Sequence, residues 1–239
     1  MLAAVFLGDG RLELKKRPIP CVKNRDDVLL RVEATSICGS DLHILDVPPT
    51  HPAEIGIIQG HEYAGEVLEV GQDVSHLNCG DRVIVSPDIR CGHCYYCQIG
   101  LTSMCENKTT LGEFADGGFA QYNVAPAQAL FRVSKSVPPE IAAVGEPLAC
   151  AMSGITKLNI QPGDAVMVLG AGPLGVLFAL LAKMCGAGKV IVSEIMEGRR
   201  AYARSLGIDV VVDPSQQDPR RLSENGYFPQ SLRQAQIFL

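Results

Sequence analysis

A short glycine-rich segment, Gly170-Ala171-Gly172-Pro173-Leu174-Gly175, does most to narrow the range of folds open to this chain. It follows an apolar run at 165–169 and leads into a second apolar run at 176–184. Glycines placed in this way permit a tight turn between a buried strand and a helix. They also let the backbone approach a pyrophosphate group at the positive end of that helix. The segment therefore predicts a dinucleotide-binding unit.

An acidic residue follows this turn at a suitable distance. Glu194 ends the apolar run 190–193, about twenty positions after the glycines, where its carboxylate can accept hydrogen bonds from both ribose hydroxyls. This position favours NAD over NADP. Arg199 could reach the adenosine, and it could equally be an ordinary solvated helix residue. The residues predicted to contact NAD are Gly170, Gly172, Pro173, Leu174, Gly175, Glu194 and Arg199.

The sequence around the turn is typical of half a doubly wound nucleotide-binding domain. A helix is expected at roughly 196–206 and a strand at 209–212, which completes a strand–helix–strand–helix–strand unit. A full domain of this type has about six strands. After Asp213 we expect neither another capped helix nor another buried strand. Residues 150–239 are therefore predicted to form the N-terminal half of a Rossmann domain, left incomplete by truncation.

The first part of the chain has a different pattern. Segments at 28–32, 65–70 and 81–85 are rich in β-branched residues and are separated by glycine, proline and aspartate, as strands and turns are. Residues 1–149 are therefore predicted to form a β-rich domain. The expected fold class is α/β, with this domain followed by a partial, doubly wound parallel sheet.

Four cysteines stand at metal-ligand spacing. Cys91, Cys94 and Cys97 are separated by two residues each, and Cys105 follows in the same loop, expected at about 88–110. Such gaps let four thiolates converge on one structural zinc ion. An iron–sulfur cluster and a set of unrelated buried thiols are the alternatives. A zinc ion held by four protein sulfurs would order the loop but would offer no open position for chemistry.

A second set of metal-ligating residue types lies upstream. Cys38, His61 and Glu62 supply a thiolate, an imidazole and a carboxylate, and three protein ligands leave one position open, as a catalytic zinc ion requires. Taken singly, a cysteine is more often a small buried hydrophobe and a histidine is more often a structural residue. Asp41 could orient His61 through a hydrogen bond, or it could cap the helix expected to begin there.

Composition restricts the partners of the chain. The 239 residues carry a net charge of −5 with scattered basic residues, so nucleic acid is not an expected partner. The apolar stretch 166–185 is interrupted by glycines, a proline and Lys183, which favours a buried strand and helix over a membrane span. The nine cysteines are odd in number and no secretion signal precedes them. We therefore expect a reducing cytoplasm and no disulfide framework.

Together these motifs resemble the zinc-dependent medium-chain dehydrogenases, and within them the sorbitol and threonine dehydrogenase branch. The motifs are CGSDLH at Cys38, GHEYAGEVLEVG at Gly60, GDRV at Gly80, CGHCYYCQIGLTSMC at Cys91, EPLAC at Glu146 and GAGPLG at Gly170. The resemblance implies a GroES-like catalytic domain with an inserted structural-zinc lobe, followed by a Rossmann domain. It implies one catalytic and one structural zinc ion, and NAD. From about Pro219 the resemblance fades.

The resemblance also implies roles for three further side chains. Ser40 and His43 would pass the hydroxyl proton of the substrate outward, although a turn serine and a surface histidine would look the same in the sequence. Glu146 would lie near the catalytic zinc ion and act through water or as an exchanging ligand. Because Pro147 follows it, Glu146 could instead be a carboxylate at the start of a helix.

These features predict an oxidoreductase that transfers a hydride to NAD from a secondary alcohol in a polyol, amino alcohol or similar small molecule. The rival interpretation is a truncated zinc-binding fragment without catalytic activity. Relatives often form dimers or tetramers through the nucleotide-binding domain. A homo-oligomer is therefore expected only where that domain is complete.

Overall fold

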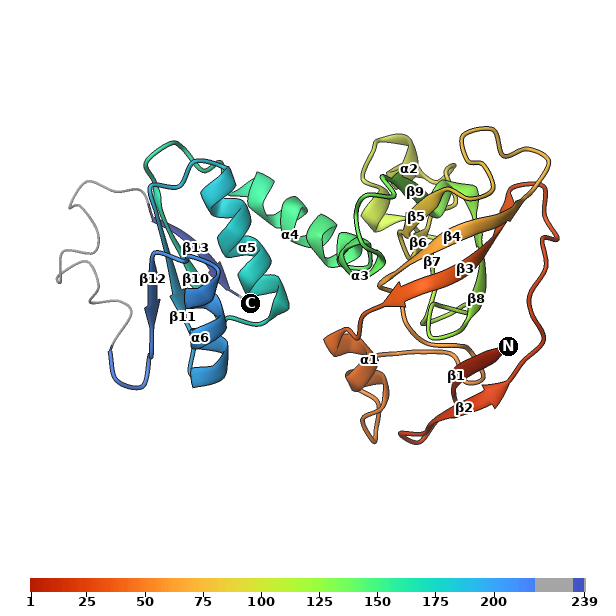
Figure 1. The fold of residues 1–239 in the computed structure, drawn as a ribbon, viewed down its shortest axis with the longest axis horizontal. Helices are drawn as coiled ribbons and strands as arrows, with labels where there is room; N and C mark the ends of the chain where they lie inside the picture. Colours follow the sequence, from red (N-terminus) through yellow and green to blue (C-terminus); the bar gives the residue numbers. More distant parts are fainter. Residues whose placement is uncertain (218–233, 239) are drawn as a thin grey trace. The chain divides into compact units, whose positions relative to one another are not determined.

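The computed structural model describes residues 1–217 and the backbone of residues 234–238 (Figure 1). Its internal contacts divide the chain into two units, Met1–Glu146 and Pro147–Leu239. The division falls near the start of helix α4 (Gly145–Lys157). Each unit has its own cluster of buried hydrophobic side chains.

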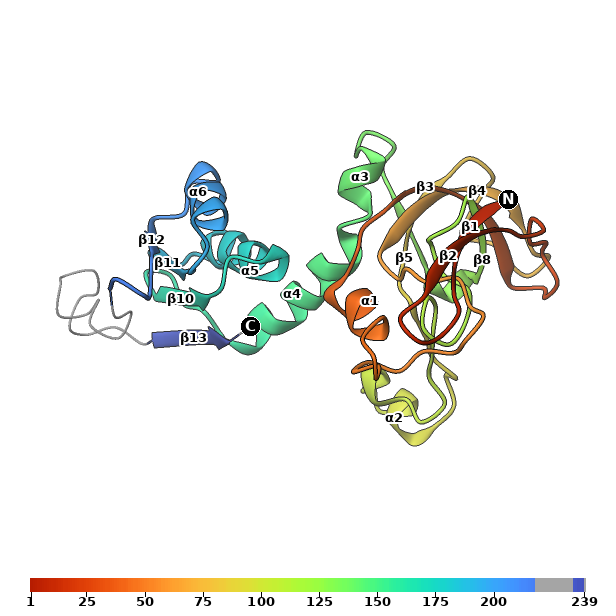
Figure 2. The same cartoon turned by 90° about the horizontal axis from the view of Figure 1, so that it is seen from below.

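The first unit is built on a five-stranded antiparallel sheet with the order β8-β3-β4-β5-β9 (Figures 1 and 2). Its strands are β3 (Asp27–Thr35), β4 (Tyr63–Val70), β5 (Arg82–Val85), β8 (Tyr122–Pro126) and β9 (Leu130–Val133). Alternating side chains on β3 and β5, among them Val28, Leu30, Val83 and Val85, are fully buried. The β-branched pattern in the sequence therefore marks one face of a sheet that is packed on a core.

Smaller elements complete this unit. Strands β1 (Leu2–Phe6) and β2 (Leu12–Lys16) form an antiparallel hairpin. The short helical elements are α1 (Gly39–Ile44), η2 (Ala127–Ala129) and α3 (Pro139–Ala142). The loop with four cysteines is closed by the antiparallel pair β6 (Asp88–Ile89) and β7 (Thr109–Thr110). Inside it lie α2 (Tyr95–Gln98) and η1 (Thr102–Met104). We refer to residues 88–110 as the cysteine lobe.

The second unit contains a four-stranded parallel sheet with the order β12-β11-β10-β13. Its elements are β10 (Ala165–Leu169), α5 (Pro173–Met184), β11 (Lys189–Ser193), α6 (Glu197–Ser205), β12 (Val210–Val212) and β13 (Gln234–Phe238). Both helices lie on the same face of the sheet (Figures 1 and 2). The strand order reverses at β10, which is the topological switch point where doubly wound sheets bind nucleotides.

The strand β13 corrects one expectation from the sequence. We expected three strands and no further strand after Asp213, yet residues 234–238 pair in parallel with β10 along its whole length. The sequence of this strand, Gln-Ala-Gln-Ile-Phe, lacks the continuous apolar run that usually identifies a buried parallel strand. This strand is defined by its backbone pairing with β10, and its apolar pattern is too short to predict it from the sequence.

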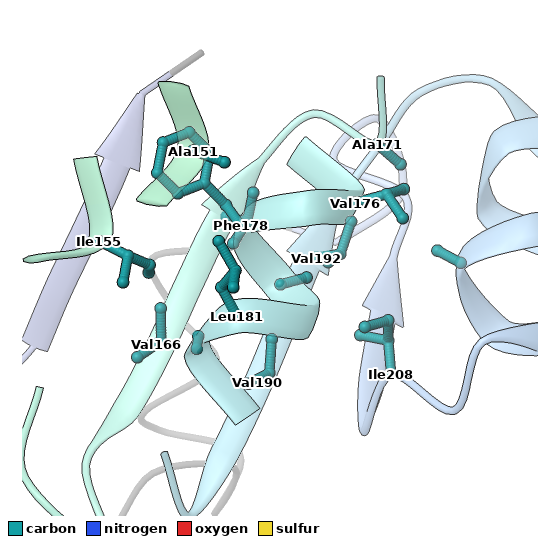
Figure 3. Packing of buried hydrophobic residues seen from close by; sticks show 14 residues of the cluster. Ala151, Ile155, Val166, Ala171, Val176, Phe178, Leu181, Val190, Val192 and Ile208 are labelled. Carbon is teal, nitrogen blue, oxygen red and sulfur yellow. The ribbon is translucent and has the colours of Figure 1, made fainter. Parts of the chain in front are cut away.

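The core of the second unit lies between α5 and the sheet (Figure 3). Val166, Val168, Val190 and Val192 point from the central strands toward the helices, and all four are fully buried. Phe178 on α5 packs so closely on Gly154 of α4 that a Cβ atom there would lie 2.6 Å from the ring. This core fixes α5, and with it the glycine turn at its start.

None of the helices in the described part of the chain combines the length and the apolar character that crossing a membrane requires.

Candidate metal centre and cofactor turn

The pairing of β3 with β4 brings the upstream ligand candidates together. Thr35 at the end of β3 lies opposite Tyr63 at the start of β4, so the residues just after β3 meet those just before β4. As a result, ligand atoms of Cys38, His61 and Glu62 lie within 4.8 Å of one another. His61 and Glu62 are buried and Cys38 is partly exposed. The site is thus anchored in the sheet and open at the cysteine.

Asp41 contacts both the start of helix α1 and the side chain of His61. One carboxylate oxygen accepts a hydrogen bond from the backbone N–H of Cys38 at 2.8 Å, which caps α1. The other, Oδ1, lies 3.5 Å from Nδ1 of His61. Neither atom has a hydrogen-bond partner among the described residues, so each is the nearest polar group available to the other. A carboxylate at Nδ1 leaves Nε2 as the nitrogen that can bind a metal.

The charge state of His61 reflects this environment. Burial lowers the pKa of His61, but the facing groups of Asp41 and Cys38 outweigh burial and raise the pKa to about 10. A cation is therefore favourable at this position. A metal ion satisfies the same acidic groups and takes the place of the proton, because a ligating imidazole must be neutral.

Ser36 is a contact of the site that the sequence did not reveal. Its hydroxyl donates a hydrogen bond to Oε2 of Glu62. Serine two residues before a cysteine is not a recognisable motif, and only the strand pairing brings it to the carboxylate. Ser40, by contrast, was expected near the site. Its hydroxyl lies 3.4 Å from Nε2 of His61.

The donor set fits a zinc ion of the catalytic type. A thiolate, an imidazole nitrogen and a carboxylate oxygen are the ligands that zinc prefers, and three of them leave a tetrahedral position open. The acidic side chains clustered around His61 are consistent with a bound dication.

Two further candidates, His43 for the proton relay and Glu146 as a ligand, are not part of the cluster of Cys38, His61 and Glu62. His43 is exposed on α1, and its Nδ1 lies 3.2 Å from Oδ2 of Asp46. Glu146 lies in the first turn of α4, directly after Gly145. Ile84 of β5 packs against Gly145 so closely that no side chain would fit there unless Ile84 moved. An acidic residue in the first turn also interacts favourably with the helix dipole. Both interpretations of Glu146 therefore stay open.

The four sulfurs of the cysteine lobe have the spacing of a zinc site. Sγ of Cys105 lies 3.6 Å from Sγ of Cys91 and 3.9 Å from Sγ of Cys94. Zn–S bonds of about 2.3 Å in a tetrahedron place the sulfurs about 3.8 Å apart. A disulfide needs about 2.05 Å, and a cluster in which each thiolate binds a different iron needs wider spacing. All nine cysteines are free thiols.

Backbone groups of the lobe prepare thiolates for a metal. Hydrogen bonds from the backbone N–H groups of His93 and Cys94 lower the pKa of Cys91 to about 6. The N–H groups of Glu106 and Cys97 lower the pKa of Cys94. Burial raises the pKa of Cys97 to about 12, so this thiol needs the metal itself to ionise.

The glycine turn leaves room for a phosphate group. Gly170 has a φ of +98°, which favours glycine, and its N–H donates to the carbonyl of Ser193 at 2.7 Å. Gly172 is the N-cap of α5, with Pro173 at the next position. Cβ atoms at Gly170 or Gly172 would meet nothing within 4 Å. The turn is therefore open at both glycines, and Leu174 and Gly175 continue the helix.

Glu194 connects the turn to the end of β11. It is buried, and its two carboxylate oxygens accept hydrogen bonds from the N–H groups of Ala171 and Met196, each at 2.8 Å. Burial raises the pKa of Glu194, but the backbone donors and the charge of Arg199 together outweigh burial. The pKa of Glu194 is therefore lower than usual. The group is therefore an anion, and each oxygen keeps a lone pair for a ribose hydroxyl.

Arg200, and not its neighbour, is the buried arginine of this region. Its guanidinium donates to the carbonyls of Glu194 and Ile195 at 2.9 and 2.6 Å and lies 3.0 Å from Asp213. Arg199 is about half exposed, with its Nη1 3.9 Å from Glu194. Adjacent arginines cannot be distinguished by composition, and only the phase of α6 decides which one points inward.

Replacing Arg200 with alanine is expected to lower the free energy of unfolding of the second unit by at least about 2 kcal/mol, because buried carbonyls lose their donor. Arg199→Ala, on an exposed side chain, should change it by less than about 0.5 kcal/mol. Urea unfolding of the two variants checks this difference. Equal losses from both substitutions would contradict the assignment of Arg200 as the residue that holds the ends of β11 and β12.

Known families and relatives match this chain over most of its length. The family "Alcohol dehydrogenase GroES-like domain" matches residues 24–135, and the family "Zinc-binding dehydrogenase" matches residues 173–226. The L-threonine 3-dehydrogenase of Pyrococcus horikoshii is 44% identical over 194 residues, which cover 80% of this chain and 56% of that protein. The chain thus spans little more than half the length of such curated relatives.

Two further proteins extend the comparison. The D-altritol 5-dehydrogenase of Agrobacterium fabrum is 37% identical over 228 residues, 94% of this chain and 67% of that protein. A Sinorhizobium meliloti structure described as a zinc-binding dehydrogenase bound to NADP superposes with a TM-score of 0.88 at 35% identity, over 92% of this chain and 64% of that one. By its motifs, its two units and these relatives, the chain belongs to the zinc-dependent medium-chain alcohol dehydrogenase family.

Proposed function

We propose that the chain carries the metal-binding catalytic domain and the cofactor turn of a zinc-dependent, NAD-linked dehydrogenase of secondary alcohols. The observation that carries the proposal is the convergence of Cys38, His61 and Glu62 on one point, with the Ser40 hydroxyl beside it. Zinc bound at this point would act as a Lewis acid and lower the pKa of a substrate hydroxyl group. The four-cysteine lobe would hold a second, structural zinc ion.

The relatives support a substrate with neighbouring polar groups. Two of them are named for reactions at carbon 3 of threonine and carbon 5 of altritol. Both positions carry a secondary hydroxyl next to a carbon that bears an amino or a hydroxyl group. A small polyol or amino alcohol is therefore the substrate class we propose for this chain.

The side chains around the ligand set have separate tasks in this reaction. Ser40 would contact the substrate oxygen, since its hydroxyl lies 3.4 Å from the ligand nitrogen of His61. His43 is exposed and would carry the released proton toward solvent. Asp46, 3.2 Å from Nδ1 of His43, would keep the proton on that nitrogen and leave Nε2 free to accept another.

The cofactor proposed here is NAD, although one relative was solved with NADP. The distinguishing group of NADP is a phosphate on the adenosine ribose, at the position where Glu194 would bind a hydroxyl. Glu194 is buried and ionised, so a phosphate beside it would meet like charge. Repulsion of this kind costs several kcal/mol, which favours NAD.

Calorimetric titration of the zinc-loaded chain with NAD tests the proposal, using Gly172→Asp as the variant. Aspartate is a preferred N-cap residue and the Cβ position is open, so the variant should fold at least as well as the wild type. Its carboxylate, however, would face the pyrophosphate. We expect affinity for NAD to fall by about 100-fold or more because of like-charge repulsion.

Gln216→Glu is the matched control, since it adds the same charge at an exposed position of the same unit. It should bind NAD as the wild type does. Absence of NAD binding by the wild-type chain, with two zinc ions present, would favour the rival interpretation of a zinc-binding protein without turnover. If the wild-type chain binds NAD, a screen of secondary alcohols with NAD is the next experiment.

A further inference from the structure

The end of β3 holds Glu62 at three points. The hydroxyl of Ser36 donates to the carboxylate oxygen Oε2, and the backbone N–H of Ser36 donates to the Glu62 carbonyl at 2.9 Å. The hydroxyl of Thr35 donates to the same carbonyl at 3.1 Å. Two of these bonds fix the backbone of Glu62, and only the bond from the Ser36 hydroxyl reaches its side chain.

The hydroxyl of Ser36 is not needed to hold the strand ends together. The backbone bond from Ser36 and the register between β3 and β4 already do so. A hydroxyl that only filled space would have no reason to contact a buried carboxylate. Its position on Glu62, 7% exposed, instead restricts which oxygen of that carboxylate is available to a ligand.

We infer that Ser36 is a positioning residue for the metal centre: by occupying Oε2, its hydroxyl restricts Glu62 to binding zinc through Oε1 alone. The inference rests on the proposed metal centre at Cys38, His61 and Glu62. A carboxylate can bind an ion through one oxygen or two, and two would fill the position that a substrate oxygen must occupy. Ser36 thus keeps that position open.

Two ligands of the site would then be oriented by partners from one short segment. Asp41 faces Nδ1 of His61, and Ser36 contacts Glu62, while the ligand Cys38 lies between them in the sequence. Such partners hold a ligand in its binding geometry before the ion arrives. Removing one typically weakens metal affinity by about 10–100-fold.

Cobalt substitution tests the inference without relying on turnover. The full-length chain is loaded with Co²⁺, whose visible absorption reports both sulfur ligation and the number of ligands. In Ser36→Ala we expect Co²⁺ affinity at the Cys38 site to fall by about 10–100-fold. We also expect weaker ligand-field bands, because a carboxylate binding through both oxygens raises the coordination number. Competition with a chelator measures the affinity for Zn²⁺ in the same samples.

Two variants and an internal reference separate this effect from a general loss of structure. Ser36→Thr keeps the hydroxyl and should restore affinity and spectrum. Thr35→Val removes a hydroxyl that donates only to the backbone carbonyls of Ser36 and Glu62, so it should leave the spectrum unchanged. Cobalt in the cysteine lobe, bound by four sulfurs, reports in every sample that the first unit has folded.

The outcomes distinguish this inference from the proposed function. Wild-type affinity and spectrum in Ser36→Ala would overturn the role of Ser36 and leave the metal centre standing. A wild-type chain that binds a single cobalt ion, in the cysteine lobe, would overturn the metal centre and the inference with it. Loss of affinity in Thr35→Val equal to that in Ser36→Ala would assign the effect to the strand end and not to the carboxylate contact.

Discussion

Under the proposed function, replacing Cys38 with serine is expected to remove one of the two proposed zinc ions and to lower kcat/KM for a secondary alcohol by about 1000-fold or more. A serine hydroxyl does not ionise as a thiol does, so only His61 and Glu62 would remain as ligands. Loss of a Lewis acid forfeits several kcal/mol of transition-state stabilisation, and each 1.4 kcal/mol corresponds to a factor of ten. Metal analysis and steady-state kinetics measure both effects.

Cys21→Ser is the control for this substitution. Cys21 is exposed and belongs to neither group of metal-ligating residues among the described residues. It should keep both zinc ions and full activity. Retention of two zinc ions by Cys38→Ser would show that Cys38 is not a ligand, whatever happened to the rate.

Replacing Cys94 with alanine is expected to open the cysteine lobe while the rest of the chain stays folded. Between residues 90 and 108 the only buried side chains are those of Cys94 and Cys105. The lobe therefore has almost no apolar core, and a metal must supply the stabilisation. Structural zinc contributes about 10–16 kcal/mol in small modules, so amide exchange in the lobe should accelerate by about 100-fold or more.

Hydrogen exchange read by mass spectrometry checks this, because peptides from the lobe and from the sheet are resolved separately. Peptides from β3 and β4 should exchange as in the wild type. Cys185→Ala, on an exposed cysteine of the second unit, is the control and should change neither. Unchanged exchange in the lobe of Cys94→Ala would mean that packing, and not zinc, holds residues 88–110.

The features that the sequence predicted well are those that depend on local spacing. The α/β fold class and the family are confirmed by the two units and by the relatives. Two-residue gaps bring Cys91, Cys94 and Cys97 together within one loop, and a glycine turn is defined by the strand and helix on either side. The roles of Ser40, His43, Glu146 and the NAD contacts stay predictions.

The features that the sequence did not reveal depend on register and helical phase. Ser36 reaches Glu62 only because Thr35 pairs with Tyr63, a contact between segments far apart in the chain. Arg200 is buried and Arg199 is not, since successive helix residues point about 100° apart. The strand β13 is formed by backbone pairing, which leaves no hydrophobic signature in a five-residue segment.

Helix α1 has only six residues, and helices this short are unstable by themselves in water. Its N-cap residue is the ligand Cys38, and its third residue, Asp41, faces the ligand His61. Occupancy of the metal site and order in α1 are therefore thermodynamically linked. Metal binding stabilises the helix, and an ordered helix strengthens metal binding by the same free energy. Because Ser40 and His43 lie on this helix, we expect metal binding to make the proposed proton path more rigid.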